Sequence, residues 1–344
     1  MKPEFIAGDE KRFFEFIGNL QEKDKIAIIS HTDPDGICSA VIASRIIKPD
    51  YIDFINYQQG IYFKVVENLK KRKISKVFFL DLVVEGEKEA IREIEKFAEI
   101  VVIDHHPLTA DLNSRKTIFL KSESRFPATY LCYYLFSKIQ KIPSWIVAVG
   151  IIDDMPQKYN EKNCNKVFLD FEIERFQCDL WRVVSDISFA IAYFKNKEKE
   201  VYDLLMRARN PEELKINEIV KKVRKDYEFW LDRYKKAREV YGNLIIFTMN
   251  PKYAIKSFLI NKISSISENK DKAFIFIREE EPLSISARCQ DKKINCPVLL
   301  QEAVKNIPKT QVGGHVAAAG ARVPRKYLSD FKKNLIEAYK KLNH

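Results

Sequence analysis

Residues 25–45 read KIAIISHTDPDGICSAVIASR, and this stretch decides the fold of the first part of the chain. The apolar, β-branched run at 25–30 predicts a buried strand, and the apolar spacing after residue 36 predicts a helix. Between them HTDPDG (31–36) places a histidine and two acids at alternate positions. A turn needs only one acid and the glycine, so the other charged side chains indicate a function beyond the turn.

Strand-like and helical patterns alternate in the residues that follow. Helical spacing separates further short apolar runs, which predict strands at 51–57, 76–82, 99–104 and 116–120. This alternation is typical of a largely parallel sheet with helices on both faces. Two apolar helical runs that each open on a proline are expected to complete the domain, at 127–140 and 143–155.

The rest of the chain predicts a helical linker and a second, smaller α/β domain. After Gly242 the pattern becomes strand-like at 243–249, 272–279 and 282–288, and then helical at 297–307 and 326–342. We expect a first α/β domain over residues 1–190, a helical linker over 191–240 and a smaller α/β domain over 241–344. A chain of 344 residues is long enough for two such cores.

Composition limits the class of protein. Apolar residues make up 46% and charged residues 31% of the chain, as in a folded globular protein. We found neither a membrane-length apolar stretch nor a signal peptide, so we expect a cytoplasmic protein without membrane contact. Six scattered cysteines predict free thiols. The net charge of +11 favours a polyanionic partner, although a lysine-rich solvated surface explains it equally well.

Acids and histidines recur at the predicted ends of strands and helices. Because the carboxyl ends of parallel strands share one edge of a sheet, these side chains are expected to converge. Each motif alone has an ordinary explanation as a turn or a helix cap. Together, carboxylates and imidazoles suit manganese or a similar divalent ion, whereas no nearby cysteine supports structural zinc. The residues are His31, Asp33, Asp35, Asp81, Asp104, His105, His106, Asp153 and Asp154.

The order of these motifs resembles a known family. HTDPDG, FLDL, VVIDHHP and GIIDD resemble the four motifs of the DHH phosphoesterase superfamily, and GGHVAAAG (313–320) resembles the signature of its DHHA1 domain. The resemblance covers most of the chain except the middle segment. Members include RecJ-type single-strand exonucleases, oligoribonucleases, cyclic-dinucleotide phosphodiesterases, exopolyphosphatases and family II pyrophosphatases. The size also resembles that of some archaeal, helicase-associated members.

The resemblance implies a site for two manganese ions, with magnesium as a substitute. His106 would contact the scissile phosphate, and Asp104 would orient a histidine. Asp154 is the expected ligand of the fourth motif, and a contribution from Asp153 stays open. Asp81 would bridge the two ions, because the implied ligands are His31, Asp33 and Asp81 for one ion and Asp35, Asp81, His105 and Asp154 for the other.

The downstream motif implies residues that contact the substrate. A glycine pair lets the backbone approach a ligand, and we expect the alanines to pack a following helix, although such a pattern alone usually reflects packing. The resemblance implies that Gly313, Gly314 and His315 face the metal site. SISAR (284–288) resembles the strand that presents an arginine to a phosphate, which makes Arg288 the expected phosphate ligand and Arg322 a weaker candidate.

These implications leave three functions open. The leading hypothesis is a manganese-dependent exonuclease that releases mononucleotides from single-stranded DNA or RNA by two-metal-assisted attack of water. The first alternative is a hydrolase of very short oligonucleotides, cyclic dinucleotides or nucleotide bisphosphates. The second is a protein associated with a helicase or replication complex, although the complete set of motif acids argues against a scaffolding role alone. A pyrophosphatase or polyphosphatase is disfavoured by the DHHA1-type signature.

Overall fold

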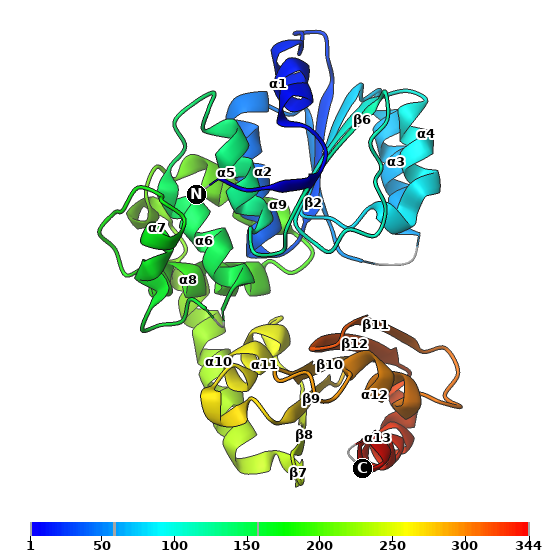
Figure 1. The fold of residues 1–344 in the computed structure, drawn as a ribbon. Coiled ribbons are helices and arrows are strands. Elements are labelled where there is room, and N and C mark those ends of the chain that lie inside the picture. The colour runs from blue at the N-terminus through cyan, green and yellow to red at the C-terminus, as the bar shows by residue number, and fades with distance from the viewer. Residues whose placement is uncertain (1, 58–59, 157, 343–344) are drawn as a thin grey trace. The chain divides into compact units, whose positions relative to one another are not determined.

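The computed structural model describes residues 2–57, 60–156 and 158–342. Contacts divide the chain into two compact units, Met1–Asn217 and Glu218–His344 (Figure 1). The boundary falls at the start of helix α10 (Asn217–Ala237). The expected division into two domains and a separate linker stays a prediction, whereas the expected fold class is confirmed, since both units combine a sheet with helices.

The first unit contains a six-stranded sheet in the order β1-β6-β5-β4-β2-β3. All neighbours are parallel except β1 and β6. The chain moves outward from β2 to β3, then returns to the other side of β2 to form β4. This reversal places the switch point of the sheet at the carboxyl ends of β2 and β4. The strands are β1 (Phe5–Ala7), β2 (Ile26–His31), β3 (Tyr51–Ile55), β4 (Lys76–Leu80), β5 (Glu99–Asp104) and β6 (Thr117–Ser122).

Helices cover both faces of this sheet. Helices α3 and α4 lie on one face over a core of alternate strand residues, whereas α2 and α5 lie on the other (Figure 1). Helices α8 and α9 pack against α6 and α2 within the same unit. The helices of this unit are α1 (Glu10–Gly18), α2 (Pro34–Ile47), α3 (Ile61–Lys71), α4 (Lys88–Glu95), α5 (Ala128–Phe136), α6 (Ser144–Asp154), α7 (Val167–Asp170), α8 (Leu180–Tyr193) and α9 (Glu198–Arg207).

The predicted strands and helices of this unit are confirmed to within a few residues, and the sheet is largely parallel as expected. Helix α1 and strand β1 were not predicted; β1 has only three residues and pairs antiparallel with β6 at the edge of the sheet. A strand this short carries too few residues for an alternating pattern to be recognised.

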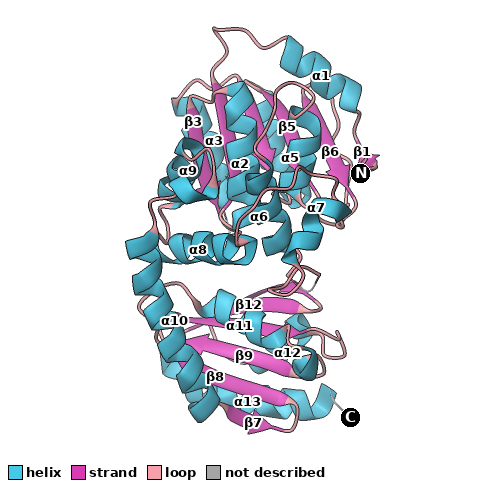
Figure 2. Ribbon diagram, turned by 90° about the vertical axis from the view of Figure 1, so that its left-hand side faces the viewer, coloured by secondary structure: helices cyan, strands magenta, loops and turns pink. Residues whose placement is uncertain are grey.

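The second unit contains a mixed sheet in the order β11-β12-β10-β9-β8-β7, in which only β8 and β9 are parallel (Figure 2). Helices α12 and α13 complete the apolar core on one face. On the other face α10 brings Tyr234 against Phe247 and Phe276, and α11 packs on β9 and β10. The elements after α10 are β7 (Glu239–Tyr241), β8 (Leu244–Met249), α11 (Lys256–Ser264), β9 (Ala273–Arg278), β10 (Leu283–Cys289), α12 (Cys296–Ala303), β11 (Gln311–His315), β12 (Ala318–Val323) and α13 (Leu328–Leu342).

The expectation that a helix follows the glycine pair is wrong. Ala318 and Ala319 begin strand β12, which pairs with both β10 and β11. Alternate residues Ala319, Ala321 and Val323 face the core, and pairing on both sides satisfies the backbone of the strand. Gly314 makes the hairpin possible, because it has φ +135° and a Cβ there would lie 2.4 Å from the carbonyl oxygen of Ala318.

Two further expectations concern cysteines and membranes. All six cysteines are free, and five are buried, so the prediction of thiols without disulfides is confirmed. Among the described residues, no helix has both the length and the apolar character that a membrane span requires.

Candidate metal centre and basic sheet face

The turn after β2 positions three polar side chains. His31 ends β2, and its Nδ1 lies 2.9 Å from Asp33 Oδ2. Asp33 caps α2 by accepting a hydrogen bond from the N–H of Gly36 at 3.0 Å. A Cβ on Gly36 would lie 2.5 Å from the carbonyl oxygen of His31, so the tight return of the chain requires glycine. The DPDG turn and the polar cluster therefore depend on the same residues.

Asp35 lies in the first turn of α2 and is fixed by a second helix. Its two carboxylate oxygens accept hydrogen bonds from the N–H groups of Ala128 at 2.9 Å and Thr129 at 2.8 Å, in the first turn of α5. The hydroxyl of Thr129 also donates to the carbonyl oxygen of Asp35 at 2.8 Å. The start of a helix favours negative charge, which explains how this buried carboxylate is oriented.

Asp81 follows β4 directly and has an unusual backbone conformation. Its φ is +57°, in the left-handed region that costs energy for a residue with a side chain, although aspartate tolerates it better than most. Its carboxylate is 2% exposed and lies between histidines, with Oδ2 3.7 Å from His31 Nδ1 and Oδ1 3.5 Å from His105 Nε2. The strained backbone holds a buried carboxylate at the centre of the cluster.

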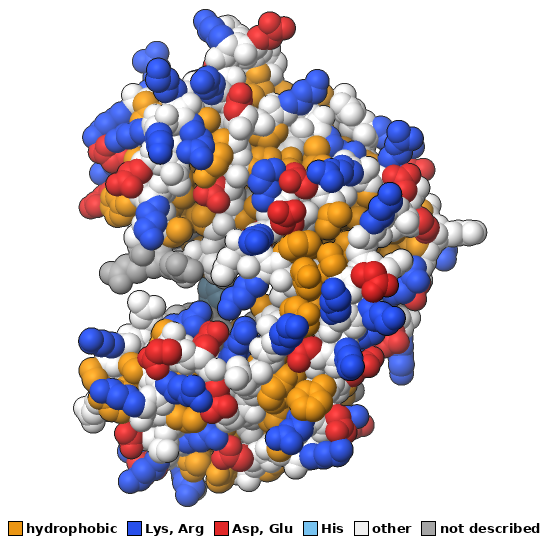
Figure 3. All heavy atoms as spheres, turned by 180° about the vertical axis from the view of Figure 1, so that it is seen from behind, with side chains coloured by type: hydrophobic (Ala, Val, Ile, Leu, Met, Phe, Trp, Pro, Cys, Tyr) orange, Lys and Arg blue, Asp and Glu red, His pale blue; other side chains and the backbone are white. Residues whose placement is uncertain are grey.

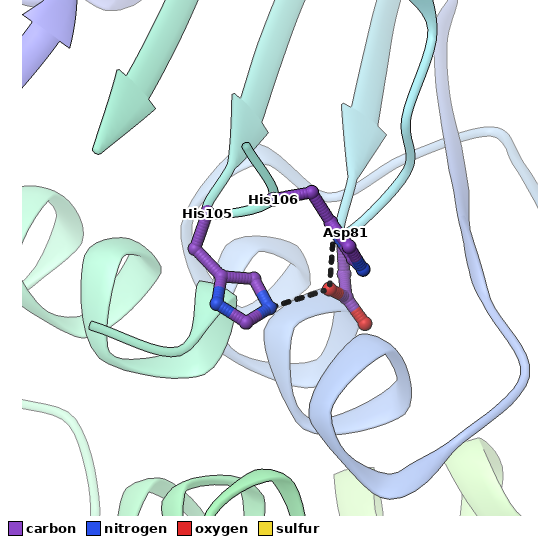
Figure 4. Close-up of side chains that lie close together, drawn as sticks. All are labelled: Asp81, His105 and His106. Carbon is purple, nitrogen blue, oxygen red and sulfur yellow. Dashed lines mark ion pairs between the residues drawn. The ribbon is translucent and has the colours of Figure 1, made fainter. Parts of the chain in front are cut away.

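The two histidines after β5 both approach Oδ1 of Asp81 (Figure 4). His105 Nδ1 lies 3.4 Å from the carbonyl oxygen of Ser124, which leaves Nε2 facing Asp81 at 3.5 Å, Asp35 at 3.7 Å and Asp154 at 3.9 Å. This is the arrangement of a metal-ligating imidazole, in which one nitrogen is fixed by a carbonyl oxygen. Asp104 Oδ1 lies 2.8 Å from His106 Nδ1 and thus orients the second ring.

The two acids of the fourth motif, Asp153 and Asp154, lie in different surroundings. Asp154 belongs to the group around His105, and its side chain is 28% exposed, so it lies at the solvent side of the site. Asp153 instead lies on α6 near α8, where its Oδ1 accepts a hydrogen bond from the hydroxyl of Ser188 at 3.5 Å. The geometry therefore places Asp154, rather than Asp153, beside the other candidate ligands.

A buried lysine supports the centre from behind. Lys121 on β6 is fully buried, and its Nζ contacts Asp104 Oδ2 and lies 2.8 Å from Glu85 Oε1. Asp104 therefore binds Lys121 through one oxygen and His106 through the other. The sequence analysis missed Lys121 and Glu85, although a lysine inside the strand pattern TIFLKS was a detectable signal.

The polar residues at the switch point form one acid–histidine cluster, namely His31, Asp33, Asp35, Asp81, His105, His106 and Asp154. Three groups in it bring their nitrogen and oxygen atoms within 4.8 Å of one another. The groups are His31, Asp33 and Asp81; Asp81, His105 and His106; and Asp35, His105 and Asp154.

The cluster fits divalent ions on two grounds. Oδ1 of Asp81 is buried and accepts no hydrogen bond from any residue that the structure describes. His105 Nε2 at 3.5 Å and His106 Nδ1 at 4.0 Å contact it as ion pairs, so the hydrogen-bonding capacity of this strong acceptor is unused. The donor atoms are carboxylate oxygens and imidazole nitrogens, which manganese and similar ions prefer. Asp81 belongs to two of the groups, as a bridging ligand would.

Crowding of the carboxylates shifts their proton affinities. Burial raises the pKa of Asp35 well above its ordinary value, and the charges of Asp81 and Asp154 raise it further. Burial also raises the pKa of Asp154 to about 6, against the opposing effect of His105. Such repulsion between carboxylates is relieved when a cation binds.

The pKa values of the two histidines after β5 are raised as well, but by attraction to carboxylates rather than by burial. Burial alone lowers the pKa of His105, but the carboxylates of Asp81, Asp154 and Asp35 outweigh it and leave the pKa well above its ordinary value. The pKa of His106 is also raised, because Asp104 outweighs burial. The neighbouring carboxylates therefore favour the protonated, positively charged form of His105 and His106.

The second unit gathers positive charge on one face of its sheet. Residues directly opposite in antiparallel pairs share a face, so Arg288 of β10, Ala318 of β12 and His315 of β11 form one row. Gly313 and Gly320 form the next row with Ser286, so this row carries no bulky side chain at its β11–β12 end. We call this surface the basic sheet face; its charged or titratable residues are Lys256, Arg278, Arg288, Arg322 and His315.

Internal contacts already occupy part of this face. Arg288 donates through Nε to Asn261 Oδ1 at 2.8 Å and through Nη1 to the carbonyl oxygen of Ala287 at 2.8 Å. Arg322 binds Glu280 at 2.7 Å. Lys256 of α11 is 7% exposed and donates to Ser284 Oγ at 2.8 Å. The sequence analysis named Arg288, Gly313, Gly314 and His315 but missed Lys256.

The structure thus collects the expected residues into two sites, one within each unit. That the second set faces the metal cluster stays a prediction. A switch-point cluster of carboxylates and histidines on a parallel α/β sheet defines a metal-dependent hydrolytic centre.

Comparison with known proteins gives the family. Residues 25–161 match the N-terminal domain of the DHH family, and residues 248–342 match the DHHA1 domain. The chain belongs to the DHH/DHHA1 phosphoesterase superfamily and is a metal-dependent phosphoesterase with a divalent-metal site. No curated protein sequence matches it.

Solved structures share the fold at low sequence identity. RecJ from Thermus thermophilus, solved with Mn²⁺, is 14% identical with a TM-score of 0.65, over 98% of this chain and 56% of that chain. CDC45 from Entamoeba histolytica is 12% identical with a TM-score of 0.62, over 96% and 98%. The pGpG-specific phosphodiesterase PggH from Vibrio cholerae is 16% identical with a TM-score of 0.55, over 93% and 99%. The chain thus spans only about half the length of the Thermus RecJ.

Proposed function

We propose that the protein is a manganese-dependent exonuclease that releases mononucleotides from single-stranded DNA or RNA. The observation that carries this proposal is the acid–histidine cluster around the bridging position of Asp81. The basic sheet face and the net charge of +11 support an anionic polymer as substrate. The likeness to a RecJ structure over 98% of this chain supports the same substrate class.

In this proposal each residue has a defined task. His31, Asp33 and Asp81 would hold one ion, and Asp35, Asp81, His105 and Asp154 would hold the other. The ions supply charge stabilisation for a phosphoryl group and activation of water when they are bound. His106, oriented by Asp104, donates from Nε2 to an oxygen of the scissile phosphate. Arg288, Gly313, Gly314 and His315 bind the nucleotide.

The metal assignment has a direct test. We expect Asp81→Asn to abolish manganese-dependent hydrolysis, because the bridging ligand is lost, while circular dichroism shows an intact fold. Calorimetric titration with Mn²⁺ should show weaker binding and fewer sites than in the wild type. Glu268→Gln, which also removes one negative charge at an exposed position in the second unit, is the matched charge control. Unchanged Mn²⁺ binding by Asp81→Asn would contradict the assignment.

The substrate class is tested with end-labelled single strands of two to about thirty nucleotides, in DNA and in RNA. An exonuclease should prefer the longer strands and release mononucleotides from one end. Raising the salt concentration should weaken cleavage of long strands more than cleavage of dinucleotides, because more phosphates are neutralised. On the face drawn in Figure 3, basic side chains are interspersed with acidic ones, so we expect a modest salt dependence.

A second candidate is a hydrolase of very short substrates, such as dinucleotides, cyclic dinucleotides or nucleotide bisphosphates. It is favoured by size, since the chain and the pGpG-specific phosphodiesterase cover 93% and 99% of each other. Cleavage confined to the shortest strands of the panel would select this function. Inactivity on every strand, with Mn²⁺ binding intact, would favour association with a helicase or replication complex, which the mutual coverage of 96% and 98% with CDC45 supports.

A further inference from the structure

Tyr57 is an exposed aromatic residue beside the acid–histidine cluster. It lies two residues after the end of β3, the strand that pairs with β2 at the edge of the sheet. The centroid of its ring lies 5.4 Å from that of His31, with 35° between the ring planes. Its exposed fraction is nevertheless 47%. The ring therefore extends the site on the side of His31.

Hydrogen bonds fix the position of this ring. The hydroxyl of Tyr57 accepts from the N–H of Val83 at 3.1 Å, and the hydroxyl of Tyr62 donates to the carbonyl oxygen of the same residue at 3.2 Å. Val83 lies two residues after Asp81 in the chain. Tyr57 is thus held at its hydroxyl and along His31, while about half of its surface stays open to solvent.

Other exposed aromatic side chains lack this placement. Phe63, Phe229 and Tyr241 are also exposed by 39% or more. Among the residues that the structure describes, only Tyr57 of these four makes a ring contact with a member of the cluster. An aromatic ring held in place beside a phosphate-binding centre is suited to stack on a flat ligand, because every nucleobase has a π-face.

We propose that Tyr57 is the stacking platform for the nucleobase of the nucleotide whose phosphate binds at the acid–histidine cluster. This inference rests on the proposed function and adds a base-binding subsite to it. Stacking of this kind is independent of base identity. The subsite therefore selects nucleotides over other phosphate esters without selecting a sequence.

The test compares binding of adenosine 5′-monophosphate with binding of ribose 5-phosphate, measured by calorimetry on the full chain with Mn²⁺ at one concentration. The two ligands share the phosphate and the ribose and differ in the base. We expect the wild type to bind the nucleotide roughly 5- to 100-fold more tightly, the range that base stacking gives. Equal affinities in the wild type would overturn the proposal.

Variants separate stacking from the structural role of the hydroxyl. Tyr57→Phe removes only the bond to Val83 and should keep the affinity ratio, and Tyr57→Trp should keep it as well. Tyr57→Leu removes the ring and should bring the ratio close to one. Phe63→Leu is the matched control, since Phe63 is 49% exposed and has no contact with the cluster among the described residues. A preserved ratio in Tyr57→Leu, or an equal loss in Tyr57→Phe or Phe63→Leu, would overturn the assignment.

Kinetics give an independent measurement on dinucleotides. If Tyr57 acts by stacking, Tyr57→Leu should raise KM by a similar factor and leave kcat nearly unchanged. If Tyr57 instead acts by fixing Val83, two residues after Asp81, its loss should lower kcat. A fall in kcat alone would therefore count against stacking. Failure of the proposed function is distinguishable, because a wild type that cleaves no strand still reports the affinity ratio in the binding experiment.

Discussion

The two units each bury a lysine, but in opposite surroundings. In the first unit the Nζ of Lys121 contacts two buried carboxylates, those of Asp104 and Glu85. In the second unit Lys256 donates to the neutral hydroxyl of Ser284, and the arginines of the basic sheet face surround it. One lysine completes an acidic site, and the other adds charge to a basic one. The same residue type therefore contacts buried carboxylates in one unit and a neutral hydroxyl among arginines in the other.

The proton affinity of Lys256 shows this difference. Burial, together with repulsion from Arg322, Arg288 and Arg278, lowers the pKa of Lys256 to about 7, and Glu280 only partly opposes the shift. A unit that retains such a group loses stability near neutral pH. An accumulation of cations on one sheet face is consistent with the proposed binding of anionic substrates there.

The largest expected effect follows from Lys121→Met. The substitution leaves Glu85 buried without its cation and Asp104 with His106 as its remaining basic partner, which costs about 3 to 5 kcal/mol of unfolding free energy in the first unit. Hydrogen exchange of the β4 and β5 peptides, read by mass spectrometry, measures it. The double variant Lys121→Met/Glu85→Gln should recover part of the loss. Slower exchange in the single variant would contradict the paired-charge description.

The same substitution in the second unit should act in the opposite direction. Lys256→Met removes a buried amine at similar volume, so the second unit becomes more stable at pH 7. The folded pKa of about 7 lies below the ordinary value of 10.5, so the unfolded state binds more protons between these values. Wild-type stability should therefore rise by about 1.4 kcal/mol per pH unit from pH 7 towards pH 10 and stay level below pH 7.

Hydrogen exchange of the β8 and β9 peptides, corrected for intrinsic exchange at each pH, measures this dependence. In Lys256→Met the rise with pH should disappear. The β4 and β5 peptides of the first unit serve as the internal control. A pH dependence that persists in Lys256→Met would show that other groups of the basic sheet face carry it.

A smaller effect is expected at Asp104, the residue that contacts both Lys121 and His106. Asp104→Asn weakens the orientation of His106 and should lower kcat/KM by about ten- to a hundredfold, as loss of a residue that orients a metal-site histidine typically does. Glu85→Gln is the control, because it also alters the partners of Lys121 but does not contact His106. Equal losses in both variants would assign the effect to Lys121 rather than to the orientation of His106.

The smallest effect concerns the acceptor of Lys256. Ser284→Ala removes the hydroxyl that accepts from its Nζ and should destabilise the second unit by about 1 kcal/mol. Ser286→Ala, two residues along the same strand and face, is the matched control. The melting temperatures of the two variants, measured by differential scanning calorimetry, should differ. Identical values would indicate that solvent replaces Ser284 as the partner of Lys256.

Patterns in the sequence were sufficient for most of the first unit. The strands ending near His31, Asp81 and Asp104 were predictable, since buried parallel strands read as continuous apolar runs. The acids and histidines that follow these strands were predictable as a group, because the carboxyl ends of parallel strands lie at the same edge of a sheet. The strand β12 was not, because small residues such as alanine and glycine have little intrinsic preference for a strand over a helix in that context. Its pairing with β10 and β11 decided the outcome.

By itself the sequence determined the order of most strands and helices, the fold class and the residues that belong to the metal cluster. Local spacing carries that information, because apolar periodicity and turn residues act between near neighbours. The tertiary structure decided that Lys121 contacts Asp104, that α5 orients Asp35, and that Tyr57 borders His31. These are contacts between residues distant in the chain, and they depend on distances and on burial that no local pattern encodes.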